Sequence, residues 1–329
     1  MRKDPGTGKR PPGGRRRSAR WCAGLLLAPV SAVLVCRACG TDGITPVPQL
    51  LAFLPWLLVP AAVALLLAAG ARWVVGCAWG LLTVAAVGLF LRPYGAAPPS
   101  APGPVRAQLR ILTANLEFGG ATQELLRALR REKPDLVSVQ ECAPEVCAVA
   151  LDGAEVRAAY PYRRIVGGGG RAEGSAILSR FPLEPDGEVR GTLAMPRAVV
   201  RVAGVALRFQ VAHPMPPVPG QVALWRTELG RLRAVTAGRD AAETVIAGDF
   251  NATQDHAAFR ALLDTGVRDS AALVGRARTP TWPALTAPPL GAQIDHVLVG
   301  AAVEPRAARF LDLAGTDHRA LVVDAVLHD

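Results

Sequence analysis

The segment Thr244-Val245-Ile246-Ala247-Gly248-Asp249-Phe250-Asn251 runs from apolar β-formers into a glycine, and a carboxylate and an amide follow two residues apart. This pattern predicts a buried strand that ends in a tight turn. Because side chains alternate along an extended chain, we expect Asp249 and Asn251 to point the same way and Phe250 to pack inward. The segment therefore predicts a polar rim at the carboxyl edge of a sheet.

Further strands and helices are expected on both sides of this segment. The sequence pattern predicts strands at residues 109–115, 136–139, 175–180, 207–212, 294–299 and 320–327, and helices at residues 121–131, 221–237 and 255–263. The first strand, helix and strand predict a parallel crossover that brings Asn115 and Glu141 to neighbouring carboxyl ends. Ligands of such α/β sheets bind at that edge.

Polar residues recur where the predicted strands end. Alone, a histidine in this position is typical of a hydrogen-bonded turn, and an Asp-His pair is typical of a cap. Three of the five histidines nevertheless share this position with the best isolated carboxylates. We therefore expect a hydrolytic site formed by these residues: Asn115, Glu141, His213, Asp249, Asn251, Asp295, Asp317 and His318.

The charge and the hydropathy are concentrated at the N-terminal end of the 329-residue chain. The net charge is +10, which first suggests a nucleic-acid partner. However, residues 1–104 hold 11 of the 37 Lys and Arg residues and two of the 27 acidic residues, a balance of +9, which leaves +1 for residues 105–329. A nucleic-acid partner is therefore the less favoured interpretation, and no protein partner is inferred.

The N-terminal part is expected to be a membrane anchor. Residues 1–20 predict a basic, disordered cytoplasmic tail, and residues 21–92 contain three apolar runs that predict three transmembrane helices. Arginines in the tail and at position 72 predict that the tail and the turn between the second and third helices lie in the cytoplasm. The third helix then delivers the rest of the chain to the outside. Residues 93–104 predict a Pro-rich linker, and residues 105–329 a catalytic domain.

At its strand ends the chain resembles the endonuclease/exonuclease/phosphatase superfamily, which has the DNase I-like fold. The matching motifs are Asn115, VQE at residues 139–141, GDFN at 248–251, IDHVL at 294–298 and TDH at 316–318. The resemblance implies an α/β fold, a four-layer α/β sandwich of two packed mixed sheets flanked by helices. The anchor with an outward-facing domain also resembles the teicoplanin-resistance membrane proteins of glycopeptide-resistance clusters.

The resemblance to the superfamily implies a role for each matching residue. Glu141 would bind Mg²⁺, with Mn²⁺ as an alternative, beside Asn115, and Asp317 would be a second metal ligand. His318, oriented by Asp295, would contact the phosphate or act as general acid or base. The other implied roles are these: Asp249 aligns the attacking water, Asn251 holds a phosphate oxygen, His213 is a second catalytic histidine, and Glu173, which pairs with His213, and Trp282 contribute to substrate binding.

The remaining histidines and the cysteines carry weaker expectations. His296 follows Asp295 and should face the opposite way, as a structural residue, and no chemistry is assigned to His256 or His328. Cys142 and Cys147 lie five residues apart, and the sequence leaves open whether they form a disulfide.

Three functions remain open from the sequence. The favoured one is a membrane-anchored, extracytoplasmic phosphohydrolase or phosphodiesterase for a phosphorylated lipid of the cell envelope, such as undecaprenyl pyrophosphate, with glycopeptide resistance as its physiological effect. The second is an outward-facing nuclease. The third is a non-catalytic envelope protein that binds a glycopeptide, which has no need of a complete acid-base set.

Overall fold

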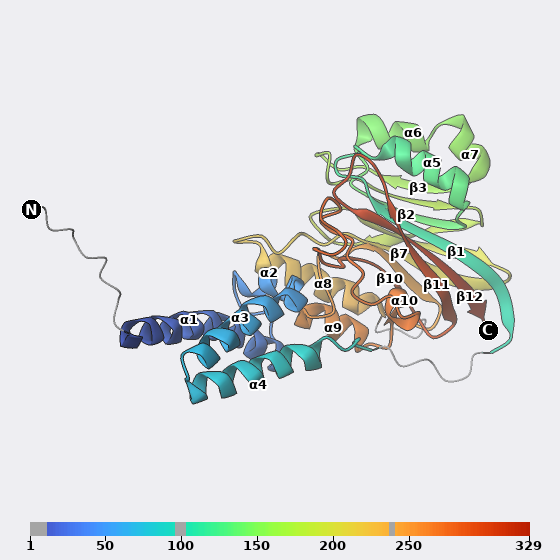
Figure 1. Cartoon of the computed structure of the whole chain (residues 1–329). Coiled ribbons are helices and arrows are strands. Elements are labelled where there is room, and N and C mark those ends of the chain that lie inside the picture. The colour runs from blue at the N-terminus through green and yellow to red at the C-terminus, as the bar shows by residue number, and fades with distance from the viewer. Residues whose placement is uncertain (1–11, 96–102, 237–240) are drawn as a thin grey trace, which may run out of the picture. The chain divides into compact units, whose positions relative to one another are not determined.

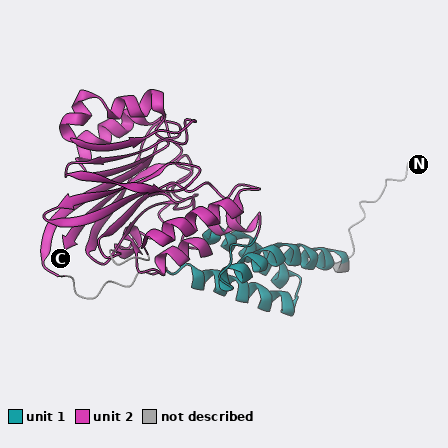
Figure 2. Cartoon of the chain, turned by 180° about the vertical axis from the view of Figure 1, so that it is seen from behind, with its two compact units in different colours: residues 1–43, 53–92 teal, residues 44–52, 93–329 magenta. Residues whose placement is uncertain are grey.

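Two six-stranded sheets form the centre of the larger of the two units into which the chain divides (Figure 2). The computed structural model describes residues 12–95, 103–236 and 241–329. Unit 1 comprises residues 1–43 and 53–92, and unit 2 comprises residues 44–52 and 93–329. Residues 44–52, which we expected in the membrane anchor, thus belong to the same unit as the catalytic residues.

The first sheet is built around a parallel pair of strands. Its order is β11 (Val303–Asp312), β12 (Arg319–His328), β1 (Val105–Asn115), β2 (Leu136–Gln140), β4 (Ser175–Ser179) and β3 (Tyr162–Val166). β1 and β2 are parallel, as the strand-helix-strand pattern predicted, and every other pairing in this sheet is antiparallel. The sheet is therefore mixed.

The second sheet repeats this arrangement. Its order is β5 (Leu183–Val189), β6 (Met195–Val202), β7 (Val205–Ala212), β8 (Thr244–Asp249), β10 (Asp295–Val299) and β9 (Arg268–Asp269). β7 and β8 are parallel, and β10 runs antiparallel beside β8. Each sheet thus places a parallel pair next to an antiparallel strand that begins where the pair ends.

The two sheets pack face to face and helices cover their outer faces (Figure 1). Ile111 and Ile177 of the first sheet share one buried cluster with Phe209 and Val245 of the second. A second cluster joins the first sheet to its covering helices, and a third does the same for the second sheet. The outer helices are α5 (Thr122–Glu132), η2 (Pro144–Ala148), α6 (Val149–Leu151) and α7 (Ala154–Ala159) on one side, and α8 (Val222–Thr236) and α9 (Ala257–Leu263) on the other, with a short α10 (Ser270–Leu273) next to β9. These layers confirm the expected four-layer α/β sandwich.

Unit 1 is formed by apolar helices. It contains α1 (Pro12–Ala38), η1 (Leu54–Leu57), α3 (Leu58–Gly70) and α4 (Val74–Phe90), whereas α2 (Val47–Ala52) belongs to unit 2. Among the described residues, one helical stretch, residues 14–38, is long and apolar enough to cross a membrane. The helical stretches at residues 54–70 and 74–90 are apolar but shorter. One candidate span is therefore found where three were expected.

Two expectations for the N-terminal part need correction. The expected disorder of residues 1–20 is wrong from Pro12 onward, because the arginines there are good helix formers and extend the apolar helix backwards. Residues 1–11 lie outside the described part of the chain. The apolar run that begins at residue 44 is not one helix: Pro46, Pro48 and Pro55 lack the backbone N–H that a continuous helix needs, and the run divides into α2, η1 and α3. Most of the expected linker, residues 96–102, also lies outside the described residues.

Candidate active site

The ends of the two parallel pairs meet at one edge of the sandwich. The strands that end there are β1 and β2 of the first sheet and β7 and β8 of the second. β10 begins at the same edge, and β12 begins directly after His318. The amide of Asn115 on β1 donates to Asp249 Oδ2 of β8 at 3.2 Å, which joins the two sheets at this edge. The edge collects these side chains from both sheets: Asn115, Glu141, His213, Asp249, Asp295 and His318.

Gly248 explains how close β7 and β8 come at the edge. It pairs with Ala212, and a Cβ atom added at position 248 would lie 2.0 Å from the Ala212 carbonyl oxygen. The glycine therefore lets His213, the residue after Ala212, lie next to the end of β8. On the other side of β8, Asp249 is the register partner of Asp295. Two buried carboxylates thus face each other on adjacent strands.

His318 lies among three aspartates. Its Nδ1 donates to Asp295 Oδ2 at 2.9 Å, and its Nε2 is 3.9 Å from Asp249 and 3.6 Å from Asp317. The loop before β12 is fixed to β1, because Thr316 Oγ1 donates to the Asn115 carbonyl and accepts from the His318 backbone N–H. The imidazole is therefore held in one orientation, with one nitrogen on Asp295 and the other directed to the site.

Glu141 is held on the other side of Asn115. The Asn115 amide donates to Glu141 Oε1 at 3.1 Å, and the Phe118 backbone N–H donates to Oε2 at 2.9 Å. Glu141 adopts a left-handed backbone conformation, with φ of 53°, as the chain turns out of β2. The next residue, Cys142, forms a disulfide with Cys147, which answers the question that the sequence left open.

His213 is enclosed and has few polar partners. Its Nε2 lies 3.9 Å from Glu141 Oε1, and its Nδ1 is buried without a hydrogen-bond partner among the described residues. Burial, together with the nearby His318, lowers the pKa of His213 to about 3. His213 is therefore neutral near pH 7 and can act there as a hydrogen-bonding group, but not as a cation.

The buried acids shift each other's protonation. Burial raises the pKa of Asp249, and Asp295 raises it further, against the opposing effects of His318 and the hydrogen bonds from Asn251 and Asn115. Burial opposes charge on His318, but Asp295 and then Asp249 and Asp317 raise its pKa to about 10. His318 is thus an imidazolium near pH 7 beside a carboxylate that takes up a proton unusually easily. Such pairs with opposite tendencies are typical of acid-base sites.

The donor set fits a divalent cation. Glu141, Asp249 and Asp295 contribute three carboxylates, and His318 is the one cation that balances them among the described residues of this edge, because His213 is neutral. Asp295 Oδ1 is buried without a hydrogen-bond partner among the described residues. One ligand atom from each of Asp249, Asp295 and His318 lies within 4.8 Å of the others, and Asn115 links this group to Glu141. Since His318 is protonated and bonded to Asp295, and Asp249 takes up a proton unusually easily, the oxygens of Glu141 and Asn115 are the more suitable ligands for a hard cation.

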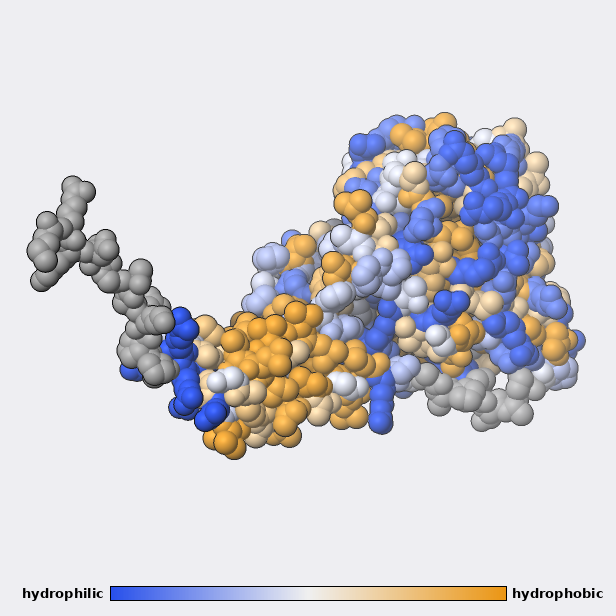
Figure 3. Space-filling view, in the orientation of Figure 1, coloured by the Kyte–Doolittle hydropathy of each residue, from blue (hydrophilic) through white to orange (hydrophobic). Residues whose placement is uncertain are grey.

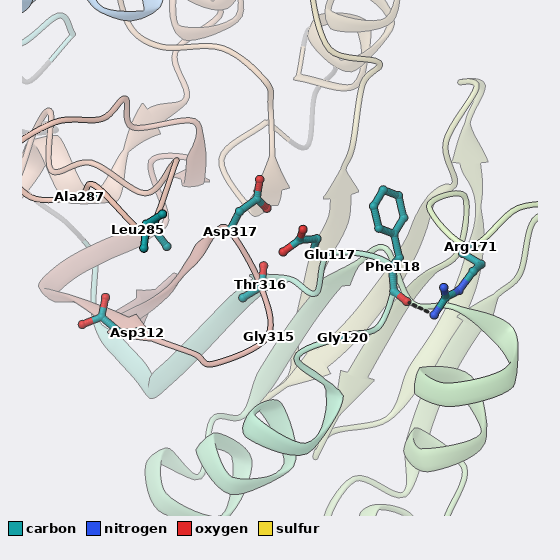
Figure 4. Close-up of a pocket in the computed structure, with 11 residues that line it drawn as sticks. Glu117, Phe118, Gly120, Arg171, Leu285, Ala287, Asp312, Gly315, Thr316 and Asp317 are labelled. Carbon is teal, nitrogen blue, oxygen red and sulfur yellow. Dashed lines mark hydrogen bonds between the residues drawn. The ribbon is translucent and has the colours of Figure 1, made fainter.

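A cavity of about 810 Å³ adjoins this edge (Figure 4). Asp317, the neighbour of His318, forms part of its wall. Phe118 and Leu285 contribute apolar surface and are 47% and 95% exposed. Arg171 donates to the Phe118 carbonyl at 3.2 Å and forms an ion pair with Glu145 at 3.0 Å. The other lining residues are Glu117, Gly120, Ala284, Ala287, Asp312, Gly315 and Thr316.

Three of the expected site residues have partners that the sequence did not indicate. Glu173 accepts a hydrogen bond from the Gly169 backbone N–H at 2.6 Å, so the expected pairing with His213 is wrong: the side chain folds back onto the glycine-rich loop. Asp317, expected as a metal ligand, accepts from Trp282 Nε1 at 2.8 Å. Trp282, expected to bind substrate, therefore fixes the loop that carries His318.

The expectation that Asp249 and Asn251 point the same way is also wrong. Phe250 is buried, as predicted, but β8 ends at Asp249 and Asn251 has a left-handed backbone with φ of 48°. The Asn251 N–H donates to Asp249 Oδ1, and its side-chain amide donates to the Pro214 carbonyl at 3.1 Å. Strand alternation does not continue through this turn, so Asn251 instead connects the end of β8 to the loop after His213.

The remaining histidines lie in other surroundings. His296 faces away from the edge, as alternation predicted, and its Nδ1 lies 2.9 Å from Asp269. Burial opposes charge on His296, but Asp269 raises its pKa. His328 at the end of β12 contacts Gly103 and Glu304. His256 is buried, and its Nε2 lies 2.8 Å from the Pro48 carbonyl of α2, at the beginning of the second apolar run.

Sequence reasoning missed the residues that support the site from behind. Gln140, at the end of β2, accepts from Thr113 and donates to Ser138, whose hydroxyl donates to the Ala247 carbonyl of the second sheet. Glu228 of α8 is fully buried and accepts from the Met215 N–H in the loop after His213. In residues 136–140, the polar side chains at positions 138 and 140 alternate with apolar ones, and this alternation could have indicated the hydrogen-bonded group of Ser138 and Gln140. Nothing in the helical pattern of α8 distinguishes Glu228 from a solvent-exposed residue.

Solved structures of similar fold come from several organisms. A humanized TDP2 from D. rerio is 18% identical, with a TM-score of 0.55, and the match covers 66% of this chain and 98% of that one. An AP endonuclease from Archaeoglobus fulgidus is 19% identical, with a TM-score of 0.53, over 67% and 99% of the two chains. The mannosyl-6-phosphatase Bt3783 of Bacteroides thetaiotaomicron is 17% identical, with a TM-score of 0.50, over 67% and 100%. At these identities the likeness shows the fold alone.

The sequence comparisons identify the family. No curated protein sequence matches the chain. The model of the Endonuclease/Exonuclease/phosphatase family matches residues 112–318, which is more than half of the chain and includes every residue of the catalytic edge. The chain therefore belongs to the endonuclease/exonuclease/phosphatase family and is a metal-dependent phosphoester hydrolase.

Proposed function

We propose that the protein is a membrane-anchored, extracytoplasmic, Mg²⁺-dependent phosphohydrolase or phosphodiesterase that acts on the phosphate of an amphiphilic envelope lipid, such as undecaprenyl pyrophosphate. The observation that carries this proposal is the mixed lining of the cavity beside His318. Its wall combines exposed Phe118 and Leu285 with the carboxylates of Glu117, Asp312 and Asp317. Arg171 is the one basic residue of this lining, and it is paired with Glu145.

The lining of this cavity disfavours a nucleic acid as the substrate. A polyanionic strand needs several uncompensated cations along its path, and its affinity depends on them. Here the acidic lining residues outnumber the single arginine, and residues 105–329 are nearly neutral. A substrate with a single phosphate or pyrophosphate headgroup and a long apolar part would instead place the headgroup at the catalytic edge and apolar surface against Phe118 and Leu285.

The exposure of the apolar helices supports membrane anchoring. Only 28% of the candidate span in α1 is buried. Leu25 of α1, Leu66 of α3 and Val74 of α4 are 70%, 73% and 81% exposed, and apolar side chains cover the visible face of these helices (Figure 3). A soluble protein seldom exposes a contiguous apolar surface of this extent. The helical stretches at residues 54–70 and 74–90 match the lower limit of about 17 residues for a span, so we propose that they cross as a hairpin.

The division of the chain supports an outward-facing site. Residues 44–52, before the hairpin, and residues 93–329, after it, belong to the same unit. We infer that both ends of the hairpin lead to one side of the membrane, opposite the arginines at the beginning of α1, which favour the cytoplasm. The Cys142–Cys147 disulfide is independent support, since structural disulfides are typical of oxidising compartments.

The site geometry supports hydrolysis by a water molecule. Asp249, whose pKa is raised, would accept the proton of the attacking water. His318, held by Asp295 as an imidazolium, would donate to the phosphoryl oxygen on which charge accumulates. Neutral His213 would donate a hydrogen bond to the same group. Mg²⁺ at Glu141 and Asn115 would stabilise the negative charge of the phosphoryl oxygens.

The test uses the full-length protein in detergent micelles or proteoliposomes. Phosphate release from a polyprenyl pyrophosphate is compared with nicking of supercoiled DNA, with Mg²⁺ and with EDTA, for the wild type and for Glu141→Gln and His318→Asn. We expect Mg²⁺-dependent phosphate release that both substitutions reduce, and little nicking. Nicking without phosphate release would establish the nuclease. Phosphate release that both variants retain would overturn the proposed site.

Resistance is tested in cells that express the same variants at equal levels. If hydrolysis of an envelope lipid protects the cell, Glu141→Gln and His318→Asn lose teicoplanin resistance together with activity. Resistance that persists in both inactive variants would support glycopeptide binding by a non-catalytic surface instead.

A further inference from the structure

Unit 1 contains a second cavity, far in sequence from the catalytic edge. Its volume is about 480 Å³, and it lies between the beginning of α1 and the turn that joins α3 to α4. The Arg20 guanidinium donates to the Ala71 carbonyl at 3.3 Å, which shows that these two segments are adjacent. The lining residues are Arg17, Arg20, Trp21, Gly24, Leu25 and Trp73.

The arginines at this end of unit 1 have no acidic counterpart. Arg15 and Arg16 precede the cavity, Arg17 and Arg20 line it, and Arg72 lies in the adjoining turn. The sequence has no Asp or Glu between positions 5 and 41 or between positions 43 and 116. Among the described residues of unit 1, no ion pair to any of these five arginines is present. The positive charge of the cavity is therefore available to a ligand.

Two tryptophans and two glycines shape the cavity. A Cβ atom at Gly76 would lie 2.1 Å from the Trp73 ring, so glycine at this position leaves room for the indole. Gly24 of α1 faces the same ring, with 4.0 Å between its ideal Cβ position and Trp73. Trp21 is 65% exposed. Indole side chains prefer the headgroup level of a bilayer, which is where a helix that begins its apolar stretch at residue 21 would place them.

We propose that this cavity binds the phosphate headgroup of an anionic phospholipid, such as phosphatidylglycerol, from the cytoplasmic leaflet. Arg17 and Arg20 supply guanidinium groups, which bind phosphate oxygens in a bidentate manner. Exposed Leu25, one turn further along α1, supplies apolar surface for the acyl chains. Uncompensated cations beside apolar surface fit a lipid anion better than a free anion, which would use the arginines alone. The proposal rests on the membrane anchoring proposed above, but it does not depend on the substrate.

The experiment measures thermal unfolding of the full-length protein in a neutral detergent with added phosphatidylglycerol, phosphatidylcholine or inorganic phosphate. We expect phosphatidylglycerol to raise the midpoint temperature of unfolding by about 4 °C, whereas phosphatidylcholine and inorganic phosphate should leave it nearly unchanged. Arg17→Gln/Arg20→Gln should lose this shift. Arg92→Gln, which removes an exposed arginine that follows α4, is the matched control and should keep it.

A second variant tests the cavity rather than the charge. Gly24→Leu places a larger side chain in front of Trp73 and retains all arginines, and its Cβ atom would lie 4.0 Å from the indole, an ordinary van der Waals distance. We expect it to lose the phosphatidylglycerol shift as well. A shift of equal size in the double arginine variant, or one that inorganic phosphate reproduces, would overturn the proposal. Hydrolysis of a water-soluble phosphoester is measured in parallel and should be unchanged in all four proteins, so that loss of the lipid site and failure of the catalytic proposal are distinguishable.

Discussion

Asp249 and Asp295 are register partners on adjacent antiparallel strands, and both carboxylates are buried at the catalytic edge. Residues far apart in the chain thus place two negative charges side by side. His318 Nδ1 compensates one of them through a 2.9 Å hydrogen bond to Asp295. The other, on Asp249, lies 3.9 Å from His318 Nε2 and is directed to the site. The aspartates therefore have different roles: one orients the histidine and the other is available for proton transfer.

Asp295→Asn should lower kcat by about 100- to 10,000-fold, the usual contribution of a general acid-base group. Removal of this charge also lowers the pKa of His318 from about 10, so the alkaline limb of the rate profile should move to lower pH. Asp317→Asn is the matched control, because Asp317 is 3.6 Å from His318 and its side chain is half-exposed. We expect the control to lose less than about tenfold. An alkaline limb that stays in place in Asp295→Asn would contradict the role of Asp295.

Activity should fall as the pH is lowered through the raised pKa of Asp249. Burial and the neighbouring Asp295 stabilise the protonated carboxyl, and only the carboxylate can accept a proton from water. The acidic limb of kcat/KM should therefore lie above the ordinary value for aspartate, about 3.9. Rates measured with saturating Mg²⁺ from about pH 4 to about pH 10 check this, and Asp249→Asn should be inactive throughout. A rate that is constant down to about pH 4 would exclude Asp249 as the base.

Removal of divalent metal should abolish hydrolysis and also lower stability. Glu141, Asp249 and Asp295 repel one another, and a cation that binds only the folded protein stabilises it by about 2.7 kcal/mol at a 100-fold excess over its Kd. Glu141→Gln should reduce the Mg²⁺-induced increase in Tm. Glu145→Gln, which changes an exposed carboxylate paired with Arg171, should retain the increase. Equal Tm shifts in both variants would place the metal elsewhere.

His256→Leu should lower the free energy of unfolding of the full-length protein by about 2–4 kcal/mol. His256 is fully buried, its Nδ1 accepts from the Thr253 N–H at 2.9 Å, and its Nε2 donates to the Pro48 carbonyl. Leucine removes both hydrogen bonds. Thr227→Ala, at an exposed position of α8, should change stability by less than about 0.5 kcal/mol. Denaturant unfolding measures both, and equal stabilities would show that residues 44–52 are not held by this contact.

Cys147→Ser should lower the free energy of unfolding by about 2 kcal/mol, since the disulfide closes a short loop next to Glu141. The same loss should appear when the wild type is fully reduced. Cys22→Ser, which changes an exposed free cysteine, is the control and should have no effect. If the protein isolated from membranes carries Cys142 and Cys147 as free thiols, the extracytoplasmic location proposed for this domain would be contradicted.

Several parts of the catalytic edge were predictable because they depend on local pattern. Apolar runs bounded by polar residues located Asn115, Glu141, Asp249 and Asp295, and alternation placed His296 on the opposite face. The parallel pairing of β1 and β2 followed from the chirality and length of the crossover. Where the local rule stopped, the prediction failed: Asn251 lies in a left-handed turn, and alternation says nothing about a side chain beyond the end of a strand.

The sequence by itself determined the strand ends, the apolar character of the N-terminal helices and the near-neutral charge of residues 105–329. Only the tertiary structure decided which ends meet, that Glu173 turns back onto the glycine-rich loop, and that residues 44–52 belong with the catalytic unit. The physical reason is the sequence separation over which each interaction acts. Hydropathy periods and turn residues act over a few positions, whereas the packing of two sheets and the compensation of buried charges depend on contacts between residues more than a hundred positions apart, such as Asn115 and Asp249.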